Sequence, residues 1–243
     1  MILYALLGLG VGVVLNWAAD ALPRRLAVSW PRCPYCGRTF ALSECSALLS
    51  GLLLRGRCAH CHSPLPWRRP LLEVASSLAF AFLWQRYASN PIHLILLSCY
   101  TSILLLVLVT DLEHRLILNT VIFPASLLAL GGSLVHPGLI SALAGGALAF
   151  ASFYLLALLR QGGLGAGDVK LAGFIGLITG FPLAVVAIVL STAVGGLVAG
   201  FLLLTRLKTL QSYIPYGPFL VFGGLAALFF GGQIVDWYLG LYG

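Results

Sequence analysis

The chain has 243 residues, of which 60% are apolar and only 9% are charged, and its formal net charge is +7. This composition excludes a soluble globular enzyme and indicates a protein that crosses a membrane several times. Because the basic residues lie in short loops between apolar stretches, the positive charge reflects membrane topology and predicts no nucleic-acid partner.

Apolar stretches long enough to cross a bilayer recur along nearly the whole chain. A helix needs about 20 residues to span a hydrocarbon core of about 30 Å. No segment alternates with the period of a barrel strand, so we predict an all-α, polytopic membrane bundle surrounded by lipid. The eight predicted spans are residues 2–22, 71–88, 92–110, 117–135, 138–159, 169–180, 182–204 and 218–240. Four or six longer spans remain an alternative around residues 169–204.

One segment of the chain looks soluble, namely residues 23–70, which hold eight of the fourteen basic residues. We therefore predict a first span at 1–22, a cytoplasmic insert at 23–70 and a larger transmembrane region at 71–243. The insert is too short to bury a large apolar core, so we expect an additional constraint to stabilise it.

The distribution of Lys and Arg predicts the orientation in the membrane. With the spans above, thirteen of the fourteen basic residues fall on one side, and only Arg86 lies near the other. Basic residues in short loops stay preferentially in the cytoplasm, so both termini are expected outside. The predicted cytoplasmic segments are 23–70, 111–116, 160–168 and 205–217.

Four of the six cysteines form two CxxC pairs in the insert, separated by 21 residues. The pairs are Cys33 with Cys36 and Cys58 with Cys61. Four thiolates at this spacing can close a tetrahedral, structural zinc site. Two disulfides or unrelated free thiols are alternatives, although a reducing cytosol disfavours disulfides. His60 and His62 lie beside the second pair and could replace a sulfur.

Two of the seven acidic residues stand at the ends of predicted spans. Asp111 follows the third span, and Asp168 precedes the sixth in the stretch GAGD. Ionisable groups in a membrane are costly and usually functional. Two adjacent carboxylates share one proton, and such a pair can hydrolyse an amide without a covalent intermediate. Gly165 and Gly167 would let the backbone approach a substrate strand closely.

Simpler roles remain open for these acids and for two others. Asp111 and Asp168 could be interfacial end groups that pair with Arg115 and Lys170. Glu73 stands at the head of a predicted span, where the helix dipole favours a negative charge, although docking of a substrate or domain is also possible. Asp20 is interpreted as an interfacial or supporting residue.

Six segments of the chain, in order, resemble the type IV prepilin peptidase family of GxGD aspartyl peptidases. They are GVGVVLN with Asn16, the two CxxC pairs, RRPLLEV with Glu73, TDLEHRLI with Asp111, GAGDVK with Asp168, and SYIPYGPFLVFGG. The similarity covers nearly the full length of the chain.

This resemblance implies a bacterial inner-membrane endopeptidase whose active site faces the cytoplasm. Its substrates would be type IV prepilins or type II secretion pseudopilins, with Asp111 and Asp168 as the catalytic pair and Gly165, Gly167, Lys170 and Glu73 in supporting roles. The resemblance also implies methylation of the new N-terminus with S-adenosylmethionine, an activity associated with the cysteine-bearing insert. No glycine-rich nucleotide-binding motif independently supports that second activity.

A non-enzymatic transporter or assembly scaffold, with a zinc knuckle that docks a partner, is the alternative function. A transporter is expected to have polar or broken helices near the membrane midplane. In this sequence the predicted midplane is almost purely aliphatic, and the acids gather at one interface. This pattern favours the peptidase.

Overall fold

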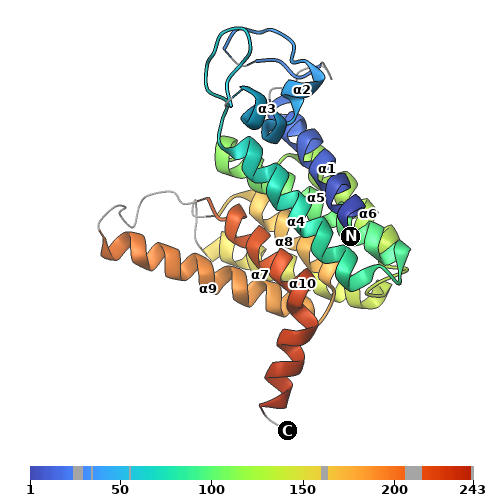
Figure 1. Cartoon of the computed structure of the whole chain (residues 1–243). Coiled ribbons are helices and arrows are strands. Elements are labelled where there is room, and N and C mark those ends of the chain that lie inside the picture. The colour runs from blue at the N-terminus through green and yellow to red at the C-terminus, as the bar shows by residue number, and fades with distance from the viewer. Residues whose placement is uncertain (24–29, 34, 55, 160–163, 206–214, 242–243) are drawn as a thin grey trace. The chain divides into compact units, whose positions relative to one another are not determined.

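The computed structural model describes residues 1–23, 30–33, 35–54, 56–159, 164–205 and 215–241. These residues form α-helices, and the only β-type pairings among them are two isolated bridges (Figure 1). The prediction of an all-α protein is therefore confirmed. The chain divides into two compact units, residues 1–109 and 110–243. The predicted boundaries at residues 22 and 70 separate membrane-spanning segments from a cytoplasmic insert, which is a different criterion from compactness. These boundaries stay a prediction.

Every predicted span coincides with a helix. The first unit contains α1 (Ile2–Ala21), α2 (Leu42–Cys45), α3 (Ala47–Leu54), α4 (Arg68–Tyr87) and most of α5 (Pro91–His114). The second unit contains the last turn of α5 followed by α6 (Asn119–Gly132), α7 (Leu139–Leu159), α8 (Ala166–Thr179), α9 (Leu183–Leu204) and α10 (Gly217–Gly240).

Five of the described helices, α1, α5, α7, α9 and α10, are long and apolar enough to cross a membrane. The other three predicted spans correspond to α4, α6 and α8. Helices α6 and α8 have 14 residues each, which gives a length of about 21 Å and is short of a full crossing. The structure thus supports a membrane-embedded protein, whereas the number of eight spans stays a prediction.

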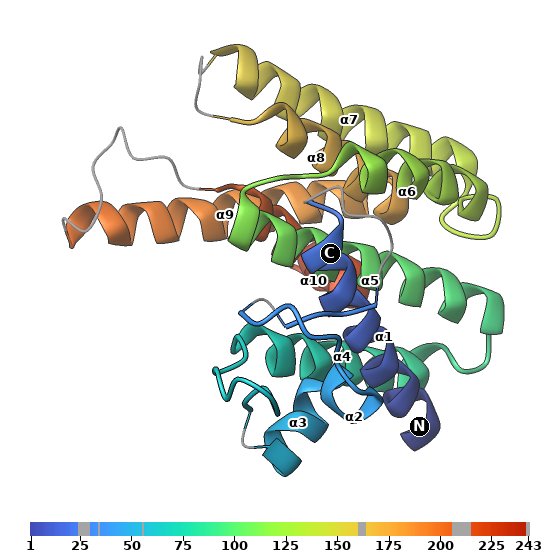
Figure 2. The ribbon, with the colours of Figure 1, turned by 90° about the horizontal axis from the view of Figure 1, so that it is seen from above.

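Small residues allow α1 and α4 to pack closely. A Cβ built on Gly12 would lie 2.7 Å from the Cα of Glu73, and one built on Gly8 would lie 2.7 Å from the carbonyl oxygen of Ser76. Figures 1 and 2 both show these two helices side by side. Helices in lipid associate through such close contacts, because burial of apolar side chains gives no advantage over the lipid itself.

Close contacts between small residues also hold α7 against α8 in the second unit, where the two helices lie side by side (Figure 2). A Cβ on Gly145 would lie 2.6 Å from the carbonyl oxygen of Gly176, and one on Gly176 would lie 2.7 Å from the carbonyl carbon of Gly145. Helix α8 ends where Gly180 adopts a φ of +68°, a conformation that favours glycine. Residues 169–204 consequently form two separate helices.

The two helix ends that carry the acids extend further than expected. Helix α5 continues to His114 and α8 begins at Ala166, so Asp111 and Asp168 lie within helical turns instead of loops. Parts of the predicted cytoplasmic segments, 160–163 and 206–214, are outside the described residues, as are the basic residues Arg24, Arg25, Arg55, Arg160, Arg206 and Lys208. The predicted orientation stays a prediction.

The α7 and α8 crossing predicts a stability effect of Gly176→Ala. Because the added methyl group meets backbone, the helices must separate, and we expect the free energy of unfolding to fall by about 1–3 kcal/mol. Thermal unfolding in detergent micelles measures the change. A Cβ added at Gly196 on α9 would have no neighbouring atom within 4 Å. Gly196→Ala is therefore the matched control and should be neutral or stabilising. Equal melting temperatures for Gly176→Ala and wild type would contradict the close packing.

Candidate active site and metal centre

Asp111 occupies the last turn of α5 and is almost completely buried, with 4% of its surface exposed. Its backbone carbonyl accepts a hydrogen bond from the amide of Arg115 at 2.9 Å, which closes the end of the helix. Its carboxylate lies against Gly217, since a Cβ built there would be 2.8 Å from the Cγ of Asp111. Among the described residues, no hydrogen-bond partner reaches the Oδ2 of Asp111.

Asp168 lies in the first turn of α8 and is also 4% exposed. Its Oδ2 accepts a hydrogen bond from the amide of Gly165 at 3.1 Å, and its own amide donates to the carbonyl of Gly165 at 3.0 Å. These reciprocal bonds start the helix earlier than the apolar pattern alone predicts. The negative charge also lies at the positive end of the helix dipole, which stabilises it.

The two carboxylates belong to the same compact unit and are close enough to interact electrostatically. The fold therefore brings together the two acids that are 57 positions apart in the sequence. Both are buried, so two neighbouring negative charges are costly and we expect the pair to hold one proton between them. Such an arrangement can activate a water molecule and protonate a carbonyl oxygen in one step.

The remaining acids of the second unit are placed differently. Glu113 is partly exposed and pairs with His114 at 3.8 Å, and Asp236 is exposed near the end of α10. Neither resembles the buried pair.

The predicted supporting residues around Asp168 contact neighbouring helices. Lys170 donates a hydrogen bond to the Oδ1 of Asn119 at 2.9 Å, and its ammonium lies 5.4 Å from the ring centroid of Phe123. A Cβ built on Gly167 would lie 2.9 Å from the Cβ of Ile117. These contacts favour packing roles, while substrate roles for Gly165, Gly167 and Lys170 stay predictions.

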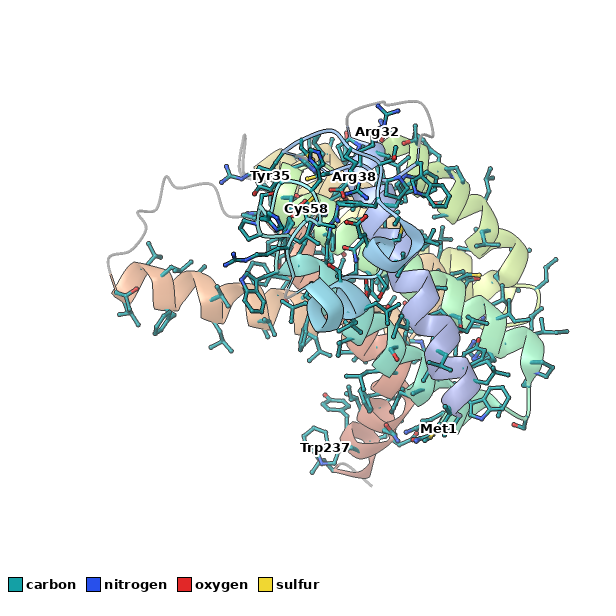
Figure 3. The ribbon with its side chains drawn as sticks, turned by 45° about the horizontal axis from the view of Figure 1, so that its top comes forward. Met1, Arg32, Tyr35, Arg38, Cys58 and Trp237 are labelled. Carbon is teal, nitrogen blue, oxygen red and sulfur yellow. The ribbon has the colours of Figure 1, made fainter. Side chains whose placement is uncertain are left out.

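The four cysteines of the insert converge in the first unit. Cys33 Sγ lies 3.8 Å from Cys61 Sγ, and Cys36 Sγ lies 4.0 Å from Cys58 Sγ. All four sulfurs lie within 4.8 Å of one another, and all six cysteines of the chain are free thiols. Figure 3 shows Cys58 together with Tyr35 and Arg38 in the insert, far from Met1 at the other end of α1.

The two CxxC turns have matching backbones. In the first, the amide of Cys33 donates to the carbonyl of Arg38 at 2.8 Å; in the second, the amide of Cys58 donates to the carbonyl of Ser63 at 3.0 Å. The residue after each pair has a positive φ, 70° at Gly37 and 56° at His62. The sequence predicts the pairs but not this shared turn, because residues other than glycine seldom adopt a left-handed backbone.

The sulfur positions fit a tetrahedral metal ion. A zinc tetrahedron with Zn–S bonds of about 2.3 Å has sulfurs about 3.8 Å apart, close to the cross-turn distances. The Ser63 hydroxyl, 3.0 Å from Cys61 Sγ, lowers the pKa of that thiol to about 6, whereas desolvation and the neighbouring sulfurs raise the pKa of the Cys36 thiol to about 11. This cluster could hold a metal ion. His60 and His62 are exposed and not part of it.

Glu44 connects the two CxxC turns. Its side chain accepts hydrogen bonds from the amides of Ala41 at 2.8 Å and Ala59 at 3.2 Å, and it lies 3.6 Å from the guanidinium of Arg38. Ala59 lies inside the second turn and Arg38 follows the first. A single buried carboxylate therefore ties both turns to α2, a role that the sequence did not reveal because Glu44 lies outside both motifs.

Glu73 has a structural role that differs from the one predicted from its own helix. It is fully buried on α4 and accepts hydrogen bonds from the Ser46 hydroxyl at 2.9 Å and from the amides of Ala47 at 2.7 Å and Leu48 at 3.1 Å. These amides begin α3, so Glu73 caps that helix and attaches the insert to α4. With both oxygens engaged, the structure favours this role over docking of a substrate.

Asp20 is also a structural residue in the first unit. Its carboxylate forms ion pairs with Arg68 and, at 2.8 Å, with Arg69, and thus joins the end of α1 to the start of α4. The carbonyl of Arg69 accepts a hydrogen bond from Asn16 at 3.0 Å, which strengthens the same contact. The interfacial interpretation of Asp20 agrees with this placement.

Comparison with known proteins identifies the family. Residues 6–87 match the bacterial peptidase A24 N-terminal domain and residues 98–201 match the type IV leader peptidase family. A Pseudomonas putida protein named prepilin leader peptidase/N-methyltransferase is 30% identical over 96% of this chain and 91% of its own length. The chain belongs to the type IV leader peptidase family.

Further relatives with the same printed name support this family assignment. A Bacillus subtilis protein is 29% identical over 96% of this chain and 95% of its own length, and a Stutzerimonas stutzeri protein is 33% identical over 86% and 74%. No solved structure matches the chain. The leader peptidase match contains both Asp111 and Asp168, and the N-terminal match contains all four clustered cysteines.

The hydrogen bonds of Glu73 predict that Glu73→Gln loosens the insert. One oxygen becomes an amino group that faces backbone N–H groups, so we expect the free energy of unfolding to fall by roughly 1–3 kcal/mol. Denaturant titration and limited proteolysis of residues 23–70 measure the effect. Glu113→Gln is the matched control, because its partly exposed pair with His114 contributes little. A Glu73→Gln protein as resistant as wild type would rule out the cap.

Proposed function

We propose that this protein is a membrane aspartyl endopeptidase that removes the leader from type IV prepilins or type II secretion pseudopilins. The observation that carries the proposal is the pair of buried, interacting carboxylates of Asp111 and Asp168. The relatives described above carry the name prepilin leader peptidase, which supplies the substrate class. A transporter or scaffold is not favoured, because these relatives are named as enzymes.

In the proposed mechanism the pair holds one proton between its two carboxyl groups. The amide of Gly165 already occupies the Oδ2 of Asp168, whereas the Oδ2 of Asp111 has no partner in the described part of the chain. We therefore place the shared proton on Asp111, which donates it to the scissile carbonyl oxygen. Asp168 accepts a proton from the attacking water, which gives a tetrahedral diol. The peptide bond breaks when Asp168 passes that proton to the leaving amine and a hydroxyl of the diol returns a proton to Asp111, which restores the pair.

The proposed location is the bacterial inner membrane, with the active site facing the cytoplasm and lipid around the bundle. Support comes from the five apolar helices and from the collection of thirteen basic residues on one predicted side. The same distribution accounts for the net charge without a nucleic-acid partner.

We assign a structural zinc ion to the cysteine cluster. Its ligands would be Cys33, Cys36, Cys58 and Cys61, whose sulfur spacing fits a tetrahedral shell. Four thiolates leave no coordination position for a water molecule, so the ion would hold the insert together and hydrolysis would belong to the aspartates. Buried Cys33 and Cys58 pack with Phe40 in a core too small to be stable alone.

The printed names of the relatives also include N-methyltransferase, and methylation of the new N-terminal amine with S-adenosylmethionine is a second proposed activity. The described residues contain no sheet with a glycine-rich turn, the usual nucleotide-binding arrangement. We assign no residues to the methyl donor and derive no step through it.

The proposed pair predicts that Asp111→Asn and Asp168→Asn each abolish prepilin cleavage. An amide keeps the shape of the side chain but exchanges no proton with water, so kcat should fall by roughly 100- to 10,000-fold in either variant. Cleavage of a purified prepilin by detergent-solubilised enzyme measures the loss. Asp236→Asn, at an exposed position, is the control and should cleave normally. Substantial cleavage by either active-site variant, at wild-type abundance, would eliminate the pair.

The proposed metal site predicts one zinc ion per chain by elemental analysis. Replacement of Cys36 and Cys61 by Ser should release the ion and unfold the insert, because binding energy in so small a region is also folding energy. Cys99→Ser, on α5, is the control and should retain the metal. A metal-free wild-type protein with full activity would refute the site. Rapid, reversible inhibition by a chelator without unfolding would indicate a metallopeptidase instead.

A further inference from the structure

The residues that begin α10 lie beside both carboxylates, although the proposed chemistry assigns them no role. Gly217 is buried as the first residue of α10 and lies against the carboxylate of Asp111. Tyr216, the residue before it, interacts electrostatically with Asp168. Two consecutive residues at the start of α10 thus lie near the pair, although α10 itself carries neither acid.

Gly217 is positioned where a side chain cannot be accommodated without moving Asp111. A Cβ at this position would lie 2.8 Å from the Cγ and 3.4 Å from the Cβ of Asp111. The next residue is Pro218, which has no amide hydrogen, and the amide of Phe219 donates to the carbonyl of Tyr216 at 3.1 Å. The start of α10, the positive end of its dipole, therefore lies against a carboxylate whose Oδ2 has no hydrogen-bond partner in the described part of the chain.

Tyr216 is held in place by aromatic packing. Its ring centroid lies 5.7 Å from that of Phe153 on α7 and 5.8 Å from that of Phe219 on α10. Its ring also covers Gly195 on α9, where a built Cβ would lie 3.1 Å from the ring.

We propose that Tyr216 and Gly217 together form a positioning element for the catalytic pair, in which the aromatic packing of Tyr216 fixes the start of α10 and the absent side chain of Gly217 leaves room for the carboxylate of Asp111. This inference rests on the proposed function, because it assigns both residues to the same active site. Both act through the carboxylates and do not themselves exchange protons with the substrate.

The first test is Gly217→Ala. We expect kcat for prepilin cleavage to fall at least about 100-fold with little change in KM, because the added methyl group displaces the carboxylate of Asp111 but leaves peptide binding intact. Gly232→Ala, on the same helix with nothing within 4 Å, is the matched control and should cleave like wild type. A folded Gly217→Ala protein with wild-type kcat would overturn the inference.

The second test compares Tyr216→Leu with Tyr216→Phe, so it decides the question even if Gly217→Ala fails to fold. The aliphatic side chain loses the ring contacts with Phe153 and Phe219, and we expect kcat to fall about 10-fold with little change in KM. Tyr216→Phe keeps the ring and should cleave like wild type, as should Tyr154→Phe at an exposed position on α7. Wild-type kcat for a folded Tyr216→Leu protein, or an equal loss in Tyr216→Phe, would overturn the role of the ring.

The two levels of the proposal fail in different ways. If Asp111→Asn and Asp168→Asn retain cleavage, the proposed function fails, and the positioning element fails with it. If both aspartate variants lose cleavage while folded Tyr216→Leu and Gly217→Ala proteins behave like wild type, the proposed function stands and only the positioning element is wrong. Melting temperature and abundance in the membrane, measured for every variant, separate loss of activity from loss of fold.

Discussion

The structure of the second unit depends on the burial of two carboxylates among apolar helices. Burial of a charge is costly unless hydrogen bonds or partners offset it. Asp168 meets this requirement through the amide of Gly165 and the start of α8, and Asp111 lies against the start of α10. The helix ends are therefore arranged around the acids, and Asp111 is close enough to Asp168 to act on it electrostatically.

Buried acids of the two units differ in how completely their oxygens are engaged. In the first unit, Glu44 and Glu73 each accept several hydrogen bonds from backbone amides or a hydroxyl, and both connect segments of the insert. In the second unit, the Oδ2 of Asp111 has no partner among the described residues. A buried carboxylate with full engagement stabilises a fold, whereas an unengaged one retains capacity for chemistry.

Glycine allows polar and helical elements to approach one another in both units. The close contacts of Gly12 with Glu73 and of Gly145 with Gly176 bring helix backbones together, and Gly217 brings a helix start to a carboxylate. The first two contacts are those expected of helices in lipid, where packing replaces the hydrophobic effect as the source of association. The contact of Gly217 with Asp111 is similarly close but lies at the proposed active site, so the packing of α10 affects the position of a catalytic carboxylate.

The sequence alone located the eight apolar helices and the four clustered cysteines and singled out Asp111 and Asp168 as candidates, because long apolar runs, CxxC spacing and rare acids are local signals; it did not predict α2 and α3 in the insert. Tertiary structure alone decided which groups each side chain meets. Glu73 stands at the head of one helix yet caps another, and Gly217 faces an acid 106 positions away in the chain. Such partners depend on how helices pack, and helix packing depends on contacts between distant residues that no local pattern records.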